Sequence, residues 1–329
     1  MAIADSLRSK LRLPVIGSPM FIVSSPELVI EQCKAGIVGS FPALNARPEP
    51  VLDEWLTRIR TELDAYQQQH PGRRVAPFAV NQIVHSSNNR LAHDIEVCVR
   101  HKVPLWITSL QAPDAVVEAA HSYGGLVYHD VTNIKHARRA LQAGVDGLIL
   151  VCAGAGGHAG ALSPFALLTA VREFYDGTII LSGAIANGAG ILAAQALGAD
   201  FAYMGTRFIA SQEANAVDAY KQAIVDSTAE EIVYTNLFTG VHGNYLRSSI
   251  VNAGLDPDAL PQADKSTMNF GSGSAQKAKA WRDIWGSGQS VAAIHDVPTV
   301  SELVDRLEAE YFAARERLQR DTRGWARET

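Results

Sequence analysis

Short apolar runs alternate with longer segments of helical spacing between residues 13 and 204. The apolar runs show almost no alternation of polar and apolar positions, which is typical of parallel strands covered on both faces. We therefore expect eight buried strands, at Leu13–Gly17, Gly36–Ser40, Pro77–Asn81, Leu105–Thr108, Gly125–His129, Gly147–Val151, Thr178–Leu181 and Phe201–Met204.

A helix or a loop follows each expected strand. Eight such units fit a closed (β/α)8 TIM barrel better than an open dinucleotide-binding sheet, because no G-x-G-x-x-G motif follows the first strand. The α/β fold class is therefore a TIM barrel. The helices expected between the strands are Pro26–Ala35, Pro48–Gln69, Arg90–His101, Pro113–Ser122, Asn133–Ala143, Pro164–Tyr175 and Gly188–Leu197.

The regular pattern ends after Gly205. Asn215–Ser227 has helical spacing, but Glu230–Thr267 mixes aromatic residues and glycines without a clear period. We expect residues 215–267 to form a smaller, mostly helical cap domain over the barrel mouth, and residues 1–214 and 268–329 to form the barrel. Helical spacing returns at Lys277–Trp285 and Val300–Arg320. The C-terminal helix could serve a homodimer or only the barrel wall.

Composition narrows the class of protein. Apolar residues make up 47% of the chain and charged residues 19%, which is ordinary for a globular enzyme. The net charge of -5 provides no basic field, so no nucleic-acid partner is expected. The N-terminus lacks the apolar region of a signal peptide, and no run spans a membrane. Three scattered cysteines indicate a reducing compartment, hence the cytoplasm, and no metal site.

The stretch Leu148–Ser163 carries the first candidate for chemistry. A buried strand there leads into a glycine-rich loop around His158. Loops at the carboxyl ends of barrel strands carry active sites, and a neutral imidazole can take a proton from a carbon acid or stabilise an anion. A loop histidine is often only solvated, but this setting favours catalysis. Cys152 has no neighbouring cation and is expected to be buried and inert, and His129 is a supporting candidate.

The loops after the last two strands suit a phosphate. Ser182 and Gly183 end the seventh strand, and Gly205 and Thr206 end the eighth. TIM barrels commonly bind a phosphate at these two loops, where glycines expose backbone N–H groups. The hydroxyls of Ser182 and Thr206 would add donors.

Three further strand ends indicate what carries the phosphate. Met20, Asn81 and Asp130 offer an apolar platform, an amide and a carboxylate to the same mouth. This set suits a planar heterocycle with a polar edge, and flavin mononucleotide (FMN) fits it. Taken singly each is weak, since Asn81 could cap a loop and Met20 could be core. The segment Trp285–Ser290 could border a ligand or simply pack its tryptophan on the barrel.

Several segments together resemble the nitronate monooxygenases, formerly called 2-nitropropane dioxygenases. The resemblance extends from about Leu13 to the Trp285 segment. It rests on Pro19-Met20, Ala79-Val80-Asn81, Ala155-Gly156-Gly157-His158-Ala159-Gly160, Ser182-Gly183, Met204-Gly205-Thr206-Arg207-Phe208 and Trp285-Gly286-Ser287-Gly288-Gln289.

The resemblance implies an FMN-bound TIM barrel that oxidises alkyl nitronates with molecular oxygen to carbonyl compounds and nitrite. It implies that His158 is the base for neutral nitroalkanes or orients the nitronate. It places the FMN phosphate at Gly183, Gly205 and Thr206. It implies that the other cofactor-binding residues are Met20, Asn81, Asp130, Gly157, Ser182 and Gln289.

Three departures from the family pattern indicate a subgroup distinct from its best-studied class. Many relatives have a lysine where this chain has His129-Asp130, a second glycine where it has Ala184, and Ala-Gly-Gln-Gly where it has Ser287–Ser290. Two other functions stay open. One is an NAD(P)H-dependent flavin reductase acting on quinones or an enoyl thioester, and the other is a flavin-binding protein without turnover.

Overall fold

The computed structural model describes residues 7–263 and 283–325. Its centre is a sheet of eight parallel strands in the order β1-β9-β8-β6-β5-β4-β3-β2. The two edges meet, because Ile16 pairs with Val38 and Gly17 N donates a 2.8 Å hydrogen bond to Val38 O. The predicted TIM barrel is thus confirmed. Its strands are β1 (Val15–Gly17), β2 (Gly39–Pro42), β3 (Phe78–Val84), β4 (Leu105–Leu110), β5 (Leu126–Val131), β6 (Gly147–Val151), β8 (Thr178–Ser182) and β9 (Phe201–Met204).

Strand positions agree with the expected runs and differ at some ends. β6 and β9 begin and end at the expected residues. β3 continues to Val84, because residues 82–84 pair with residues 108–110 of β4. β2 lies later than Gly36–Ser40, at Gly39–Pro42, where it is in register with β3.

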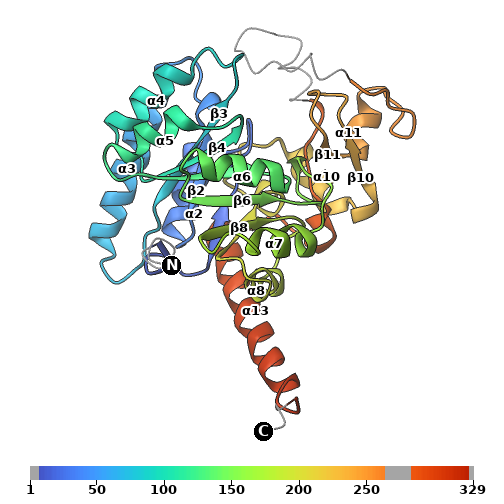
Figure 1. Ribbon diagram of the computed structural model, residues 1–329. Coiled ribbons are helices and arrows are strands. Elements are labelled where there is room, and N and C mark those ends of the chain that lie inside the picture. The colour runs from blue at the N-terminus through green and yellow to red at the C-terminus, as the bar shows by residue number, and fades with distance from the viewer. Residues whose placement is uncertain (1–6, 264–282, 326–329) are drawn as a thin grey trace.

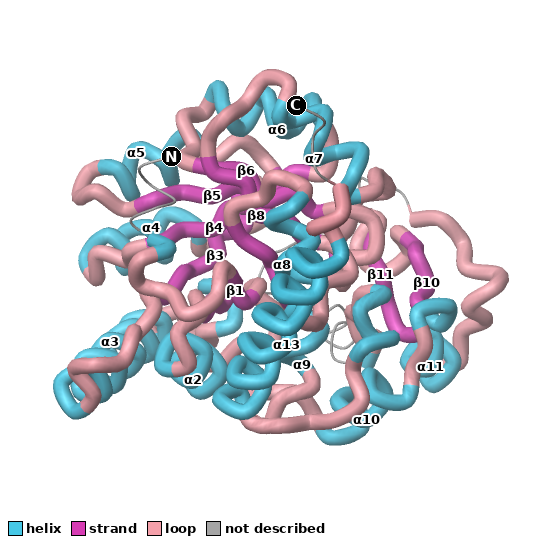
Figure 2. Tube along the Cα trace, turned by 90° about the horizontal axis from the view of Figure 1, so that it is seen from below, coloured by secondary structure: helices cyan, strands magenta, loops and turns pink. Residues whose placement is uncertain are grey.

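Helices surround the barrel (Figure 2). Asn133, Ser163 and Asn187 each precede a helix, and their side chains accept a hydrogen bond from a first-turn N–H, which fixes where these helices begin. The helices are α2 (Pro26–Lys34), α3 (Val51–Gln69), α4 (Leu91–Arg100), α5 (Asp114–His121), α6 (Ile134–Gln142), α7 (Pro164–Arg172), α8 (Gly188–Ala196), α9 (Thr206–Ile209), α10 (Asp218–Asp226), α11 (Arg247–Asn252) and α13 (Val300–Asp321), with 3-10 turns at η1 (Ala43–Asn45), η2 (Ala229–Glu231) and η4 (Gln289–Ala293).

The strands separate two apolar layers. Side chains inside the barrel, such as Ile107, Tyr128 and Phe201, form one buried cluster. Alternate positions, such as Trp106 and Val127, pack outward in the larger cluster under the helices. Because successive strand residues point to opposite faces, each position in a strand is assigned to one layer. Parity therefore decides which polar residues can reach the barrel mouth.

A second sheet lies beside the barrel (Figure 1). It is antiparallel, with the order β10-β11-β7, and contains β10 (Ile232–Thr235), β11 (Gly243–Leu246) and the short β7 (Gly157–His158). The sequence analysis expected short helices here. α10 and α11 are present, but the sheet was not predicted. Its strands are short, and β7 belongs to the glycine-rich loop after β6.

The C-terminal helix α13 begins at a capping box, in which Thr299 and Glu302 satisfy each other's backbone N–H groups. Its buried residues, including Leu303 and Leu307, pack against the barrel helices. Its C-terminal half extends away from the barrel (Figure 1). The helix expected at Lys277–Trp285 lies mostly outside the described residues. Within the described ranges, no helix is long and apolar enough to cross a membrane.

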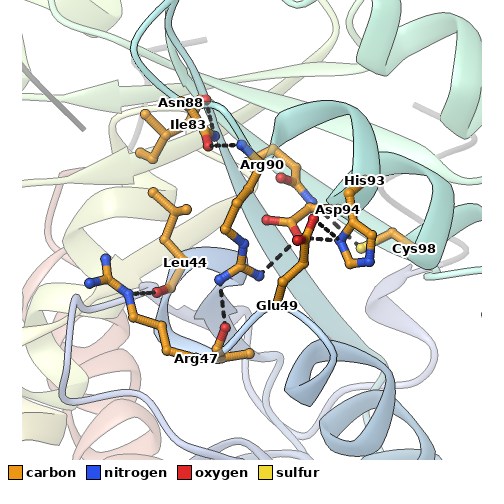
Figure 3. A network of polar contacts seen from close by, with 11 residues as sticks. Leu44, Arg47, Glu49, Ile83, Asn88, Arg90, His93, Asp94 and Cys98 are labelled. Carbon is orange, nitrogen blue, oxygen red and sulfur yellow. Dashed lines mark hydrogen bonds and ion pairs between the residues drawn. The ribbon is translucent and has the colours of Figure 1, made fainter. Parts of the chain in front are cut away.

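A buried ion pair lies at the start of α4, and one of its residues also bonds to the loop after β2 (Figure 3). Arg90 Nη2 lies 2.9 Å from Asp94 Oδ1, and both side chains are almost inaccessible to solvent. Arg90 Nη1 also donates a 2.6 Å hydrogen bond to the backbone oxygen of Ala46. A buried pair of this kind is costly to break, because the remaining charge loses its partner. It holds the loop after β2, which borders the barrel mouth.

Candidate active site

Polar side chains occupy inward positions in the middle of β3 and near the ends of β4 and β5. Asn81 Nδ2 donates hydrogen bonds to Ser109 Oγ at 3.0 Å and to Ile107 O at 3.3 Å. Ser109 Oγ in turn donates a 2.6 Å hydrogen bond to Asp130 Oδ2. The structure thus brings Asn81 and Asp130 together through Ser109, a residue that the sequence analysis missed. Ser109 and Asp130 are inward-facing positions on neighbouring strands, and this alternation of side chains could have identified Ser109 from the sequence.

Two buried polar atoms at this hydrogen-bonded network have no hydrogen-bond partner among the described residues. They are Asp130 Oδ1 and the hydroxyl of Tyr203, on β5 and β9. Burial raises the pKa of Asp130 to about 7, although the bond from Ser109 opposes the shift. Burial, followed by the negative charge of Asp130, raises the pKa of Tyr203 well above its ordinary value. Buried polar atoms usually have partners, so this pair marks a place for a polar group of a ligand or for water.

His158 lies on β7, at the side of the mouth formed by the loop after β6. β7 pairs with β11, His158 opposite Gly243 and Gly157 opposite Asn244. The ring Nε2 lies 2.9 Å from Thr239 Oγ1. Burial lowers the pKa of His158 to about 4, so the imidazole is neutral near pH 7. A neutral imidazole can accept a proton.

The glycine loop before His158 packs against the segment 286–289. Gln289 N donates a 3.0 Å hydrogen bond to Gly154 O, and Gly288 N donates a 2.9 Å bond to Thr206 Oγ1. A Cβ atom on Gly156 would lie 2.8 Å from Gly288 N and 2.9 Å from Thr206 Oγ1, closer than side-chain carbons approach. These glycines are therefore required for the close approach of the two segments.

Asn244 of β11 ties this packing to the second sheet. Its Nδ2 donates a 2.7 Å hydrogen bond to Ala155 O, and its backbone oxygen accepts a 3.1 Å bond from Ser287 N. The side chain is buried. Neither Asn244 nor Thr239 was predicted from the sequence, because no local pattern places residues 239–244 against residues 155–158.

The loops after β8 and β9 both approach the glycine loop that precedes His158. Gly183 has φ of 142°, and a Cβ atom there would lie 2.8 Å from Ala153 O. The next residue, Ala184, adopts φ of 55°, a left-handed conformation that favours glycine. A Cβ atom on Gly205 would collide with Ser18 Oγ and lie 3.5 Å from Met20 Sδ. Met20 and Gly205 are therefore neighbours. Ser182 pairs in register with Tyr203.

Two further residues singled out in the sequence are His129 and Trp285, and only His129 lies elsewhere than expected. His129 is buried on the outer face of β5, where its Nδ1 lies 2.7 Å from Thr108 Oγ1. Because Asp130 points inward, strand parity turns His129 toward the helices, away from the barrel mouth. Trp285 stacks on Tyr220 of α10 with ring centroids 5.0 Å apart. The tryptophan thus packs on α10, and the residues after it contact the glycine loop; that this segment borders a ligand stays a prediction.

Comparison with solved structures places the fold. A nitroalkane oxidase from Streptomyces ansochromogenes superposes with a TM-score of 0.76 at 24% identity, covering 95% of this chain and 99% of that chain. FabK from Thermotoga maritima superposes with a TM-score of 0.75 at 24% identity, covering 97% and 98%. These likenesses show a shared TIM-barrel fold.

A protein-family model described as nitronate monooxygenase matches residues 65–310. The chain belongs to this family of flavin-dependent oxidoreductases, as the glycine–histidine loop and the residues at the strand ends predict. A nitronate monooxygenase from Paraburkholderia phytofirmans is 26% identical over 354 residues, covering 93% of this chain and 94% of that relative.

Proposed function

We propose that this enzyme uses FMN to oxidise alkyl nitronates with molecular oxygen, giving carbonyl compounds and nitrite. The observation that carries the proposal is a neutral, half-buried His158 at the glycine-lined mouth of a nitronate monooxygenase barrel. Neutral nitroalkanes become substrates when His158 first removes the proton next to the nitro group.

The residues at the mouth fit FMN. Three loops approach one another with glycine at the contacts, so backbone N–H groups rather than side chains would face a phosphate. Thr206 Oγ1 accepts a hydrogen bond from Gly288 N, so the hydroxyl proton of Thr206 can be donated to an anion. We assign the phosphate to Ser182, Gly183, Gly205 and Thr206, with Gln289 beside them. We assign the heterocycle to Met20, Asn81, Asp130 and Gly157.

The flavin, when bound, supplies the redox chemistry between nitronate and oxygen. The chain's own residues bind, orient and move a proton. His158 takes the proton of a neutral nitroalkane and then faces the nitronate as an imidazolium, which balances its negative charge. We assign residues 215–267 to a cap, and β11 in its described part pairs with the strand that carries His158. Three buried free cysteines, Cys33, Cys98 and Cys152, support a cytoplasmic location.

The first test is spectroscopic. The purified protein is mixed anaerobically with ethylnitronate and, separately, with NADH and NADPH. A flavin spectrum that bleaches with nitronate and not with reduced nicotinamide is expected. Bleaching by nicotinamide alone would establish a flavin reductase instead, and a protein that cannot bind FMN would refute the cofactor assignment.

The second test is the His158→Asn variant. Turnover of nitroalkanes should fall by about 100-fold or more, the usual worth of a general base, and turnover of preformed nitronates should fall much less. Equal losses on both substrates would refute the base assignment. His121→Asn is the matched control, because His121 lies on α5 and pairs with Asp146 at the protein surface.

A further inference from the structure

A cleft of about 430 Å³ lies at the loops after β1 and β2, on the mouth side of the barrel. Phe21 and Ile22 of the first loop line it, and so does Trp55 of α3. The volume is within the roughly 300–1,000 Å³ that small-molecule sites occupy. None of the residues assigned to FMN lines this cleft, so its occupant would be a second ligand.

The walls of the cleft include flat apolar surface. Trp55 is partly exposed, and its ring packs edge-on against the fully buried Phe41, with ring centroids 5.5 Å apart. Leu44, in the 3-10 turn after β2, also lines the cleft. Aromatic side chains that are held in this way pack favourably against the ring of a ligand. The cleft therefore suits a flat aromatic group.

Arg47 adds a positive charge that has no counter-charge. Its Nε donates a 2.7 Å hydrogen bond to Leu44 O (Figure 3), and its guanidinium lies over the ring of Phe21, 5.3 Å from the centroid. Within residues 7–263 and 283–325, no carboxylate pairs with Arg47, and neither of its Nη atoms donates a hydrogen bond. Partial burial, and then the positive charge of Arg90, lower the pKa of Arg47. An anion beside Arg47 would oppose both effects, because it stabilises the charged guanidinium.

The second arginine of the cleft already has carboxylate partners. Arg58 forms ion pairs with Glu27 at 2.5 Å and with Glu62 at 2.8 Å. Glu27 lines the cleft as well and would repel an anion from that side. The position for an anion is therefore at Arg47, whose planar guanidinium has the geometry that carboxylates and phosphates accept.

We propose that this cleft binds a small ligand in which a flat aromatic ring carries a carboxylate or a phosphate. The ring lies against Trp55 and Leu44, and the anion accepts hydrogen bonds from the Nη atoms of Arg47. This site is separate from the flavin site, and the inference goes beyond the proposed function.

The backbone at Ile22 supports a binding role. Ile22 is exposed and has φ of 68°, a left-handed conformation that β-branched residues rarely adopt. Ile22 N donates a 3.0 Å hydrogen bond to Asn45 Oδ1, and Asn215 Nδ2 donates a 2.9 Å bond to Ile22 O. Asn45 Nδ2 also donates a 3.0 Å bond to Met20 O. Strained backbone of this kind is concentrated at ligand sites, and here one asparagine connects the cleft to the barrel mouth.

The first experiment locates the binding by NMR of the full-length protein with ¹⁵N-labelled tryptophan. The Trp55 indole signal is the one that is lost in Trp55→Phe. The probes share one ring and differ in charge: 2-naphthoate, 2-naphthyl phosphate and neutral 2-naphthol. We expect both anions to shift the Trp55 signal saturably and to bind roughly tenfold or more tightly than 2-naphthol, as hydrogen bonds to a charged group predict.

The tighter of the two anionic probes identifies the acidic group of the ligand. A Trp55 signal that neither anion shifts, or equal affinity for all three probes, would overturn the proposal.

The second experiment removes the charge. In Arg47→Met the affinity for both anions should fall roughly tenfold or more, to the level of 2-naphthol, whose own affinity should not change. Arg47→Lys keeps a positive charge and should keep most of the preference for anions. Arg139→Met is the matched control, because Arg139 is exposed on α6 and does not line the cleft.

A preference for anions that survives in Arg47→Met, or that is lost equally in Arg139→Met, would overturn the role of Arg47. Neither experiment uses a nitronate or measures turnover. Failure of this proposal is therefore distinguishable from failure of the proposed function.

Discussion

Ser109 Oγ donates a 2.6 Å hydrogen bond to Asp130 Oδ2, joining two inward-facing positions on neighbouring strands. The second carboxyl oxygen is buried without a partner among the described residues. The site therefore contains a carboxyl group that is half satisfied, which costs free energy when it is ionised.

This relationship predicts how stability depends on pH in the apoprotein. The folded pKa of Asp130, about 7, lies above the ordinary value of 3.8. The folded state therefore binds more protons between about pH 4 and pH 7, and stability falls as pH rises through that window. Asp130→Asn should remove this loss, which amounts to ~4 kcal/mol at pH 8. Urea unfolding at pH 5 and pH 8 measures it, and an unchanged pH slope would contradict the burial of the carboxyl group.

His129 should have the opposite effect. Burial, and then the charge of His136, lower the pKa of His129 from 6.5 to about 4. The folded state binds fewer protons in this window, so stability is lost as pH falls from about 6.5 to 4. His129→Asn should remove ~3 kcal/mol of that acid sensitivity and leave the flavin spectrum unchanged. Unfolding curves at pH 7 and pH 4.5 test this, and a changed spectrum would place His129 at the mouth after all.

Gly288 should not tolerate a side chain. A Cβ atom there would collide with Gly154 O and lie 2.8 Å from Gly156 N, and both are backbone atoms that cannot turn aside. Gly288→Ala should separate the two segments and weaken FMN binding by roughly tenfold or more, equal to about 1.4 kcal/mol. Fluorescence titration of apoprotein with FMN measures the affinity. Gly72→Ala is the control, because nothing lies within 4 Å of its added carbon. Equal affinities in both variants would contradict the packing.

Replacing Ala184 with glycine should stabilise the protein. The φ of 55° at Ala184 costs an L-residue about 1–2 kcal/mol. The greater unfolded-chain entropy of glycine costs about 0.5–1 kcal/mol. The free energy of unfolding of Ala184→Gly should therefore rise by up to ~1.5 kcal/mol. Ala186→Gly, at a buried position outside the left-handed region, should lose stability. Thermal unfolding of the two variants compares them, and equal losses would show that Ala184 is not strained.

The barrel could be predicted because its strands are buried on both faces and read as uninterrupted apolar runs. The alternation of side chains between the two faces of each strand could also have been used to predict which polar residues face the interior. With Asp130 facing inward, His129 had to face outward, and Tyr203 had to share the interior. The pairing of β7 with β11 could not be predicted, since a two-residue strand has no periodicity. The contact between Thr239 and His158 depends on that pairing, so it could not be predicted from the spacing of residues in the sequence.

The strand pair β7–β11 has a consequence for how such an enzyme diversifies. His158, the proposed base, lies on β7 and pairs with β11 of the β10–β11 hairpin, whereas Asn81, Asp130 and Ser182, proposed for the cofactor, lie on barrel strands. Insertions or deletions in the hairpin connection at residues 236–242 would shift the imidazole relative to an unchanged barrel. Natural variation and directed evolution can therefore alter substrate range at this connection while the cofactor scaffold keeps its stability.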